Sequence, residues 1–332
     1  MTTNMSSMNT IYRLLYAAVE QQASDLHVSP RAIALRVAGD LILLDEIPPS
    51  AEVITGLLTP EQMTILNQVH SVDMSGDMPG VARYRVNIFQ TLEGLSAAFR
   101  IIPYAIPTLD DLIAPPIIAS LSQLSHGLIV VTGPTGSGKS TTLAAIVNYI
   151  NMHSAKHVVT IEQPIEFIHP HQRSLVQQRE VGQHTQDVVS ALSATLRQDP
   201  DVIVIGEMRD TASIRLAITA AETGHLVLAT LHTNSAPEAV DRIIQSVPAG
   251  EQPLMRTILS HVLQGVIAQT LLRKQGGGRI AVYEIMTCNA AIRHLIREHK
   301  VAHMASTIQT SQSDGMISKE QYIKQLFGKG ML

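Results

Sequence analysis

The stretch Gly133-Pro134-Thr135-Gly136-Ser137-Gly138-Lys139-Ser140-Thr141 decides the fold class of this 332-residue chain. It fits the G-x-x-x-x-G-K-[ST] pattern, whose glycines let backbone N–H groups turn inward around phosphates. The apolar run Leu128–Val131 before it is typical of a strand, and the run Thr141–Ile150 after it is typical of a helix. The positive N-terminal end of such a helix also attracts phosphate. We therefore predict a nucleotide-binding site here.

Two side chains of this stretch have predicted roles toward a nucleoside triphosphate. We expect Lys139 to contact the β- and γ-phosphates, and the hydroxyl of Ser140 to ligate Mg²⁺. The residues from Gly133 to Thr141 together are expected to form the cradle, so ATP and Mg²⁺ are the predicted cofactors. The alternative is an ordinary glycine-rich turn, which the strand before it and the helix after it disfavour.

The rest of this region has the pattern of a parallel α/β sheet, because apolar runs typical of buried strands alternate with helical stretches. The predicted strands are Leu128–Thr132, His157–Ile161, Val202–Ile205 and Leu226–Leu231. We predict helices over residues 235–272 and 288–326. Between them we predict one more strand near Arg279–Ile285, after the turn Gly276-Gly277-Gly278.

The beginning of the chain predicts a separate, smaller α+β domain with a mostly antiparallel sheet. An apolar stripe over residues 10–23 indicates an amphipathic helix with Thr10 as its N-cap. Thr59-Pro60-Glu61-Gln62 combines a capping box with a proline at the first helical position, and so predicts a helix over residues 60–69. The predicted domains are residues 1–103 and 108–332, joined by a proline-containing linker at residues 104–107.

Composition limits the classes of protein to which the chain can belong. Hydrophobic residues make up 45% and charged residues 16%, as in a chain with packed cores. The net charge of −4 argues against broad electrostatic capture of nucleic acid, and we expect no nucleic-acid partner. The single cysteine, Cys288, allows no internal disulfide and no multi-cysteine zinc cluster. With no signal-peptide pattern at the N-terminus, we predict a cytoplasmic location.

Three carboxylates follow predicted strands, where ATP hydrolysis needs a group to orient water and to help hold the metal ion. Glu207 comes directly after the strand Val202–Ile205, with Gly206 in the position usually taken by an aspartate. Glu162 and Glu166 follow the strand His157–Ile161. A single acidic residue at a strand end is usually a solvated or capping group. Three of them beside a phosphate loop favour catalytic roles.

Two histidines bracket the predicted strand Leu226–Leu231. His225 stands before it and His232 follows it. The functional interpretation is a sensor that links the state of the nucleotide to a neighbouring element, and the alternative is a structural role. Both interpretations stay open at this point.

These motifs resemble those of the secretion and type IV pilus superfamily of hexameric ATPases. The resemblance rests on the phosphate loop and three further segments: Thr160–Phe167, Asp199–Asp210 and Ala220–His225. Within that superfamily the chain resembles the PilT-type retraction ATPases of twitching motility. The segments that carry this closer resemblance are Ala23–His27, Arg83–Asn87 and Ala291–Glu298.

The resemblance implies an architecture and a set of site residues. It implies a PAS-like N-terminal domain, a RecA-like ATPase domain with C-terminal helices, and a ring of six subunits. It also implies that Arg83, Arg85 and Arg100 reach the nucleotide as cations that stabilise charge at the γ-phosphate. Among the carboxylates, Glu207 is implied near Mg²⁺ and water, and Glu166 as the group that activates water, with Glu162 close behind.

The resemblance also implies a function. That function is an ATP-hydrolysing motor of type IV pilus retraction, held at the cytoplasmic face of the inner membrane by a pilus platform protein, with a paralogous pilus ATPase as a further partner. Gln163 departs from the family pattern, which has an aspartate before Pro164. This departure keeps two alternatives open: a weakly hydrolysing accessory paralogue, and an ATPase of type II or type IV secretion.

Overall fold

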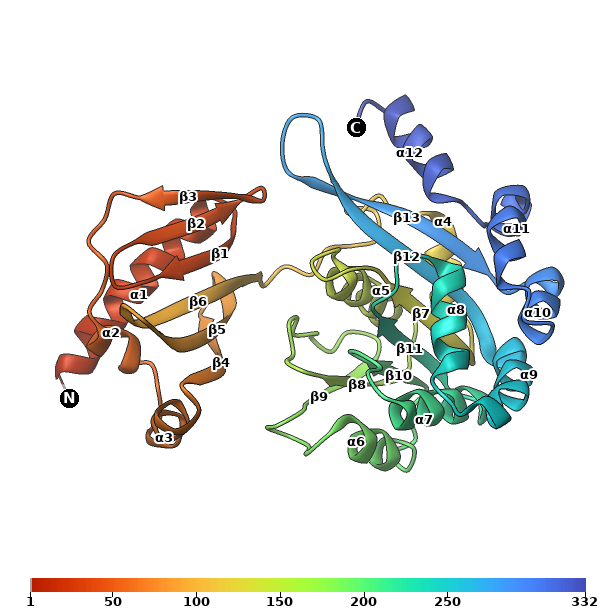
Figure 1. Cartoon of the computed structure of the whole chain (residues 1–332), viewed down its shortest axis with the longest axis horizontal. Helices are drawn as coiled ribbons and strands as arrows, with labels where there is room; N and C mark the ends of the chain where they lie inside the picture. The colour runs from red at the N-terminus through yellow and green to blue at the C-terminus, as the bar shows by residue number, and fades with distance from the viewer. Residues whose placement is uncertain (1) are drawn as a thin grey trace. The chain divides into compact units, whose positions relative to one another are not determined.

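The computed structural model describes residues 2–332, with side chains described from Thr10 onward. The chain divides into two compact units, of which the first ends at Ala105 and the second is Ile106–Leu332. In Figure 1 the first unit is coloured red to orange and the second yellow to blue.

The first unit is built on a six-stranded sheet in the order β3-β2-β1-β6-β5-β4, in which all neighbouring strands are antiparallel. Its elements are α1 (Thr2–Glu20), β1 (Ala23–Val28), β2 (Ile33–Val37), β3 (Asp40–Leu44), α2 (Ala51–Thr55), α3 (Pro60–Val69), β4 (Ser71–Met78), β5 (Ala82–Thr91) and β6 (Gly94–Pro103). The antiparallel sheet confirms the fold predicted for this part of the chain.

The two helices predicted in this unit have different outcomes. The stripe of α1 is buried, with Ile11, Leu14 and Leu15 no more than 1% exposed, but the helix begins at Thr2. Thr10 lies inside it and is not its N-cap, because the chain before Thr10 is already helical. The helix over residues 60–69 is confirmed, with a complete capping box between Thr59 and Gln62.

The second unit contains a seven-stranded sheet in the order β13-β12-β7-β11-β10-β8-β9. All neighbours in it are parallel except β12 and β13. Its strands are β7 (Gly127–Thr132), β8 (His157–Glu162), β9 (Leu175–Glu180), β10 (Val202–Ile205), β11 (Leu226–Leu231), β12 (Leu263–Arg273) and β13 (Arg279–Thr287). The predicted strands at β7, β8, β10, β11 and β13 are therefore confirmed, and the fold class is α/β.

Helices cover both faces of this sheet. The helices are α4 (Pro116–Ser122), α5 (Lys139–His153), α6 (Val188–Thr195), α7 (Thr211–Glu222), α8 (Ala236–Gln245), α9 (Gln252–Val262), α10 (Ala290–Arg297), α11 (Met304–Thr310) and α12 (Lys319–Gly328), with short 3₁₀ turns at Ala249–Glu251, Val301–His303 and Gln312–Asp314. Along β7, Leu128 packs into the core shared with α7 to α11, and Ile129 packs into the core shared with α4, α5 and α12. Because successive residues of a strand face opposite sides, both faces of β7 are buried.

One sequence prediction is wrong in a way that affects the site. Residues 235–272 are not helical throughout: α9 ends at Val262, and β12 begins at Leu263. β12 pairs with β7 on one side and with β13 on the other, so its apolar side chains are buried by its neighbours in the sheet. No helix among residues 2–332 is long and apolar enough to span a bilayer.

Candidate nucleotide-binding site

The glycine-rich stretch forms a loop between the last residue of β7, Thr132, and the first residue of α5, Lys139. Gly136 and Gly138 adopt φ angles of 76° and 86°, a conformation that side chains disfavour, so glycine is required at both positions. Ser140, in the first turn of α5, is exposed. The loop therefore presents the N-terminus of a buried fifteen-residue helix together with an accessible hydroxyl.

Lys139 is largely buried and folds back over its own loop. Its Nζ atom donates to the carbonyl of Gly133 at 2.7 Å and to that of Pro134 at 3.0 Å. Burial lowers the pKa of Lys139, and the negative charges of Glu207 and Glu166 oppose that shift. Two carboxylates, from the segments that follow β10 and β8, thus act electrostatically on the loop lysine.

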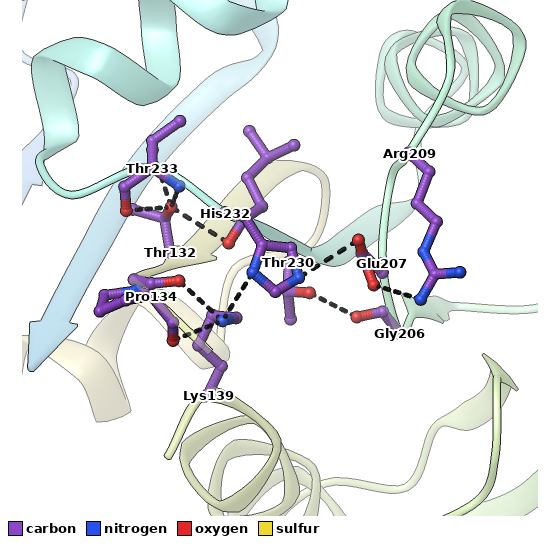
Figure 2. A network of polar contacts seen from close by, with 11 residues as sticks. Thr132, Pro134, Lys139, Gly206, Glu207, Arg209, Thr230, His232 and Thr233 are labelled. Atoms are coloured by element: carbon purple, nitrogen blue, oxygen red, sulfur yellow. Dashed lines mark hydrogen bonds and ion pairs between the residues drawn. The ribbon is translucent and has the colours of Figure 1, made fainter. Parts of the chain in front are cut away.

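Glu207, just beyond β10, is held by two side chains of its surroundings (Figure 2). Its Oε2 atom accepts from Arg209 at 2.9 Å, and its Oε1 atom accepts from Nε2 of His232 at 3.2 Å. Burial acts to raise the pKa of Glu207, but the hydrogen bond and charge of Arg209, together with His232, outweigh it and lower the pKa. The carboxylate form is therefore favoured.

His232 connects Glu207 to the loop lysine, as Figure 2 shows. Its Nδ1 atom lies 3.4 Å from Nζ of Lys139. Because an ammonium group only donates, Nδ1 must accept in this contact, which leaves the ring proton on Nε2 to donate to Glu207. One neutral tautomer of His232 thus satisfies both neighbours.

Hydrogen bonds of threonines hold together the strand ends near Glu207 and His232. At the end of β7, the hydroxyl of Thr132 lies 2.8 Å from that of Thr233 and accepts from the Thr233 N–H at 2.9 Å. The hydroxyl of Thr230 donates to the carbonyl of Gly206. Both contacts are drawn in Figure 2 and tie the ends of β7, β10 and β11 into one rigid edge.

Glu162 and Glu166 lie on the next strand of this edge and in the loop that follows it. β8 pairs with β10, so Glu162 at the end of β8 lies beside the end of β10. Its Oε1 atom accepts from Thr160 at 2.6 Å and from Gln178 at 3.1 Å. Burial raises the pKa of Glu162, and the charge of Glu166 adds to the rise. The pKa values of Glu162 and Glu207 are thus shifted in opposite directions.

Two residues of β9 that sequence reasoning missed hold this loop in place. Gln178 donates to Glu162 and to the carbonyl of Phe167, and Glu180 accepts from the N–H of Ile165 at 3.0 Å. Strand β9 itself was not predicted. The only signal for it is a short mixed run, Leu175–Glu180, in which apolar residues are few.

His225 and His232 lie at opposite ends of strand β11. His225 precedes β11, whose first residue, Leu226, pairs with Gly127 at the start of β7. Its Nδ1 atom lies 3.0 Å from the carbonyl of Ala220 near the end of α7. Within this chain the structure brings His232 to the phosphate loop and does not bring His225 there.

The three arginines singled out from the sequence belong to the first unit and share one face of its sheet. Arg83 and Arg85 are two residues apart on β5, and Arg85 pairs directly with Arg100 on β6. Arg85 forms an ion pair with Asp73 at 3.5 Å, and Arg100 forms one with Asp25 at 3.1 Å.

The side chains at the edge of the second unit fit Mg²⁺. Within residues 2–332 no three His, Cys, Asp or Glu side chains form a metal-binding cluster. Mg²⁺ usually takes only one or two protein oxygens and completes its shell with phosphate and water. The exposed hydroxyl of Ser140 and the ionised carboxylate of Glu207 are oxygen ligands of that type.

A parallel sheet with a glycine-rich loop, a lysine and a helix N-terminus at its carboxyl edge defines the class of P-loop nucleotide-binding proteins. A family model described as "Type II/IV secretion system protein" matches residues 84–327. The chain therefore belongs to the type II/IV secretion ATPase family.

Relatives within this family are closely similar over nearly the whole chain. The type IV pilus retraction ATPase PilT of Pseudomonas aeruginosa is 46% identical over 97% of this chain and 95% of its own length. A twitching motility protein of Neisseria gonorrhoeae is 47% identical over 90% of this chain and 81% of its own. The crystal structure of the pilus retraction motor PilT with bound ADP superposes with a TM-score of 0.86 at 40% identity, covering 96% and 93% of the two chains. The chain is thus a PilT homologue, and nucleotide binding is supported by the ADP in that structure.

Proposed function

We propose that the chain hydrolyses ATP with Mg²⁺ at this loop. The observation that carries the proposal is the connected group of Lys139, His232 and Glu207 at the carboxyl edge of the sheet. In this proposal the loop from Gly133 to Thr141 binds the phosphates, and Lys139 exchanges its carbonyl partners for β- and γ-phosphate oxygens.

The carboxylates have separate proposed roles. Mg²⁺, when bound, neutralises charge that develops on the phosphates. Ser140 and Glu207 are the residues proposed to hold it. Glu166 is proposed to accept the proton of the attacking water, because it acts electrostatically on Lys139. Glu162 is the alternative base, although its raised pKa favours a proton on it.

We propose that Arg83, Arg85 and Arg100 supply positive charge to the γ-phosphate. Exposed ion pairs contribute only about 0–1 kcal/mol, so Arg85 can leave Asp73 for a phosphate at little cost. Arg100 is itself exposed, but its partner Asp25 is largely buried, so moving Arg100 to a phosphate costs more. A planar, permanently charged guanidinium suits this role, because it binds phosphate oxygens in pairs.

The work driven by hydrolysis is proposed to be retraction of a type IV pilus. This extends to the chain what the name of its PilT relative says. The proposed assembly is a homohexamer in the cytoplasm, bound peripherally to the inner-membrane platform protein of the pilus, with a paralogous pilus ATPase as a further partner. Helix α10 (Ala290–Arg297) makes up most of the retraction-type segment Ala291–Glu298. It is anchored by Ile292 and Ile296, which are fully buried, and exposes Ala291, His294 and Arg297.

Turnover by the purified oligomer tests the enzymatic part of the proposal. Lys139→Ala is expected to lower ATP turnover at least a hundredfold, since the loop loses its only lysine toward the phosphates. Undiminished turnover in this variant would contradict the mechanism. Deletion of the gene tests whether hydrolysis drives pilus retraction. Lost motility with abundant surface pili supports retraction, whereas lost secretion with normal pili supports export.

A weakly hydrolysing accessory subunit is the second candidate, and Gln163 is the observation that favours it. Gln163 is exposed beside Glu162 and carries no charge. If this missing charge limits hydrolysis, Gln163→Asp is expected to raise turnover several-fold. High turnover in the natural chain, unchanged in Gln163→Asp, would exclude the hypothesis that the chain is a weakly hydrolysing accessory subunit.

A further inference from the structure

Strand β12 lies directly beside the strand that leads into the phosphate loop. Its residue Ala268 pairs with Thr132, the last residue of β7. The next residue, Gln269, is 2% exposed and reaches under the loop, where its Nε2 atom donates to the carbonyl of Ser137 at 2.6 Å. A side chain outside the glycine-rich motif thus contacts the loop backbone directly.

Gln269 also fills the space beneath both ends of the loop. A Cβ atom added to Gly133 would lie 2.3 Å from the backbone oxygen of Gln269, and one added to Gly138 would lie 3.1 Å from its Nε2 atom. The first distance is impossible for real atoms, and the second is tighter than ordinary contact. Glycine is therefore needed at position 133 because the backbone of β12 passes close to it, and is favoured at position 138 because the side-chain amide of Gln269 lies against it.

The hydrogen bond to Ser137 orients a peptide group of the loop. A trans peptide is planar, and its C=O and N–H point in opposite directions. With the Ser137 carbonyl directed at Gln269, the N–H of Gly138 must point away from β12. Backbone N–H groups that face away from the supporting strand are the groups with which such a loop binds phosphate.

The oxygen atom of the Gln269 amide lies in an unfavourable environment. The Oε1 atom of Gln269 is buried and has no hydrogen-bond partner among the described residues. An unpaired buried acceptor destabilises a protein, and an apolar side chain of similar shape would avoid it. The hydrogen bond from Nε2 to the carbonyl of Ser137 is the favourable interaction that offsets part of this loss.

We propose that Gln269 is a positioning residue for nucleotide binding: it fixes the Ser137–Gly138 peptide so that the loop N–H groups are set for phosphate before the nucleotide arrives. Such preorganisation strengthens binding, because the loop no longer has to be ordered when the ligand binds. The inference rests on nucleotide binding at this loop.

The first test compares ADP binding to the full-length oligomer by calorimetry, without Mg²⁺. Gln269→Leu keeps the shape of the side chain but removes the donor, and is expected to raise the Kd of ADP about tenfold. Thr270→Val is the matched control, since it changes the next residue of β12, whose side chain faces the other side of the sheet. The Kd of ADP for Thr270→Val is expected to stay within twofold of that for the natural chain.

The second test uses Gln269→Glu and pH. An ionised carboxylate cannot donate to the Ser137 carbonyl, whereas a protonated one can. Burial raises the pKa of a carboxyl group, so protonation should be measurable near neutral pH. The ratio of the Kd of ADP in this variant to that in the natural chain is expected to fall at least threefold between pH 8.5 and pH 6. A general loss of packing would not produce this recovery.

The outcomes separate this inference from the proposed function. If the natural chain itself fails to bind ADP, the proposed function fails. If the natural chain binds and Gln269→Leu binds equally well, or loses no more than Thr270→Val, the positioning role is wrong. If Gln269→Leu does not fold, Gln269→Glu decides: a Kd ratio that does not change with pH overturns the proposal.

Discussion

The Nζ atom of Lys139 lies 3.4 Å from Nδ1 of His232, and the other nitrogen of the same ring contacts Glu207 at 3.2 Å. A residue of the phosphate loop and a residue after β10 are therefore joined through one imidazole. If Lys139 moves toward a phosphate, it leaves the contact with the ring that also binds Glu207.

Replacing His232 should affect hydrolysis more than nucleotide binding. In His232→Phe, Lys139 keeps its carbonyl partners, but Glu207 loses the Nε2 donor. We expect turnover to fall at least tenfold, with the Kd of ADP changed by less than threefold, measured by steady-state ATPase assay and calorimetry. His153→Gln, at the exposed C-terminal end of α5, is the control. Equal losses in binding and turnover would argue against a linking role.

Arg209 should set the pH below which activity is lost. Burial acts to raise the pKa of Glu207, and Arg209 is the main group that lowers it. If Glu207 acts as a carboxylate, activity is present above its pKa and is lost as the pH falls through it. In Arg209→Met that pKa rises, so the acidic limb of the turnover profile is expected to move to higher pH. Arg209→Lys, which keeps the charge, should restore most of the original profile; an acidic limb unmoved in Arg209→Met would exclude this role.

Arg100 distinguishes a charge needed for hydrolysis from a surface ion pair. If Arg100 stabilises charge on the γ-phosphate, Arg100→Ala is expected to lower turnover about a hundredfold or more with little change in ADP affinity. Arg31→Ala is the control, because Arg31 is likewise an exposed arginine of the first unit that forms an ion pair, with Glu93. Should both variants retain turnover within threefold of the natural chain, Arg100 acts only as the partner of Asp25.

Gly206 tests whether the aspartate usual at this strand end can be restored. A Cβ atom at Gly206 would lie 3.3 Å from the Cα atom of Glu162 and 3.3 Å from the carbonyl oxygen of Ile161. Both contacts are with backbone, so Gly206→Asp is expected to displace Glu162 and to lower stability by about 1–3 kcal/mol. Turnover should fall, not rise. Chemical denaturation and the ATPase assay check the two parts, and a stable variant with faster turnover would contradict the packing argument.

The sequence identified the parts of the site that depend on local pattern. The phosphate loop is contiguous, and Glu207, Glu162 and His232 each follow an apolar run, so strand ends could be located from periodicity. The sequence could not show that Gln178 holds Glu162, because this contact depends on how β8 and β9 are placed side by side.

The sequence by itself determined the fold class, the loop and its strand and helix, because each rests on residues near one another in the chain. The tertiary structure decided β12. Read alone, Leu263–Arg273 is an apolar run that a helix could equally well contain, and only pairing with β7 and β13 makes it a strand. That pairing places Gln269 beneath Ser137, 132 positions away in the chain, a contact that no local pattern encodes.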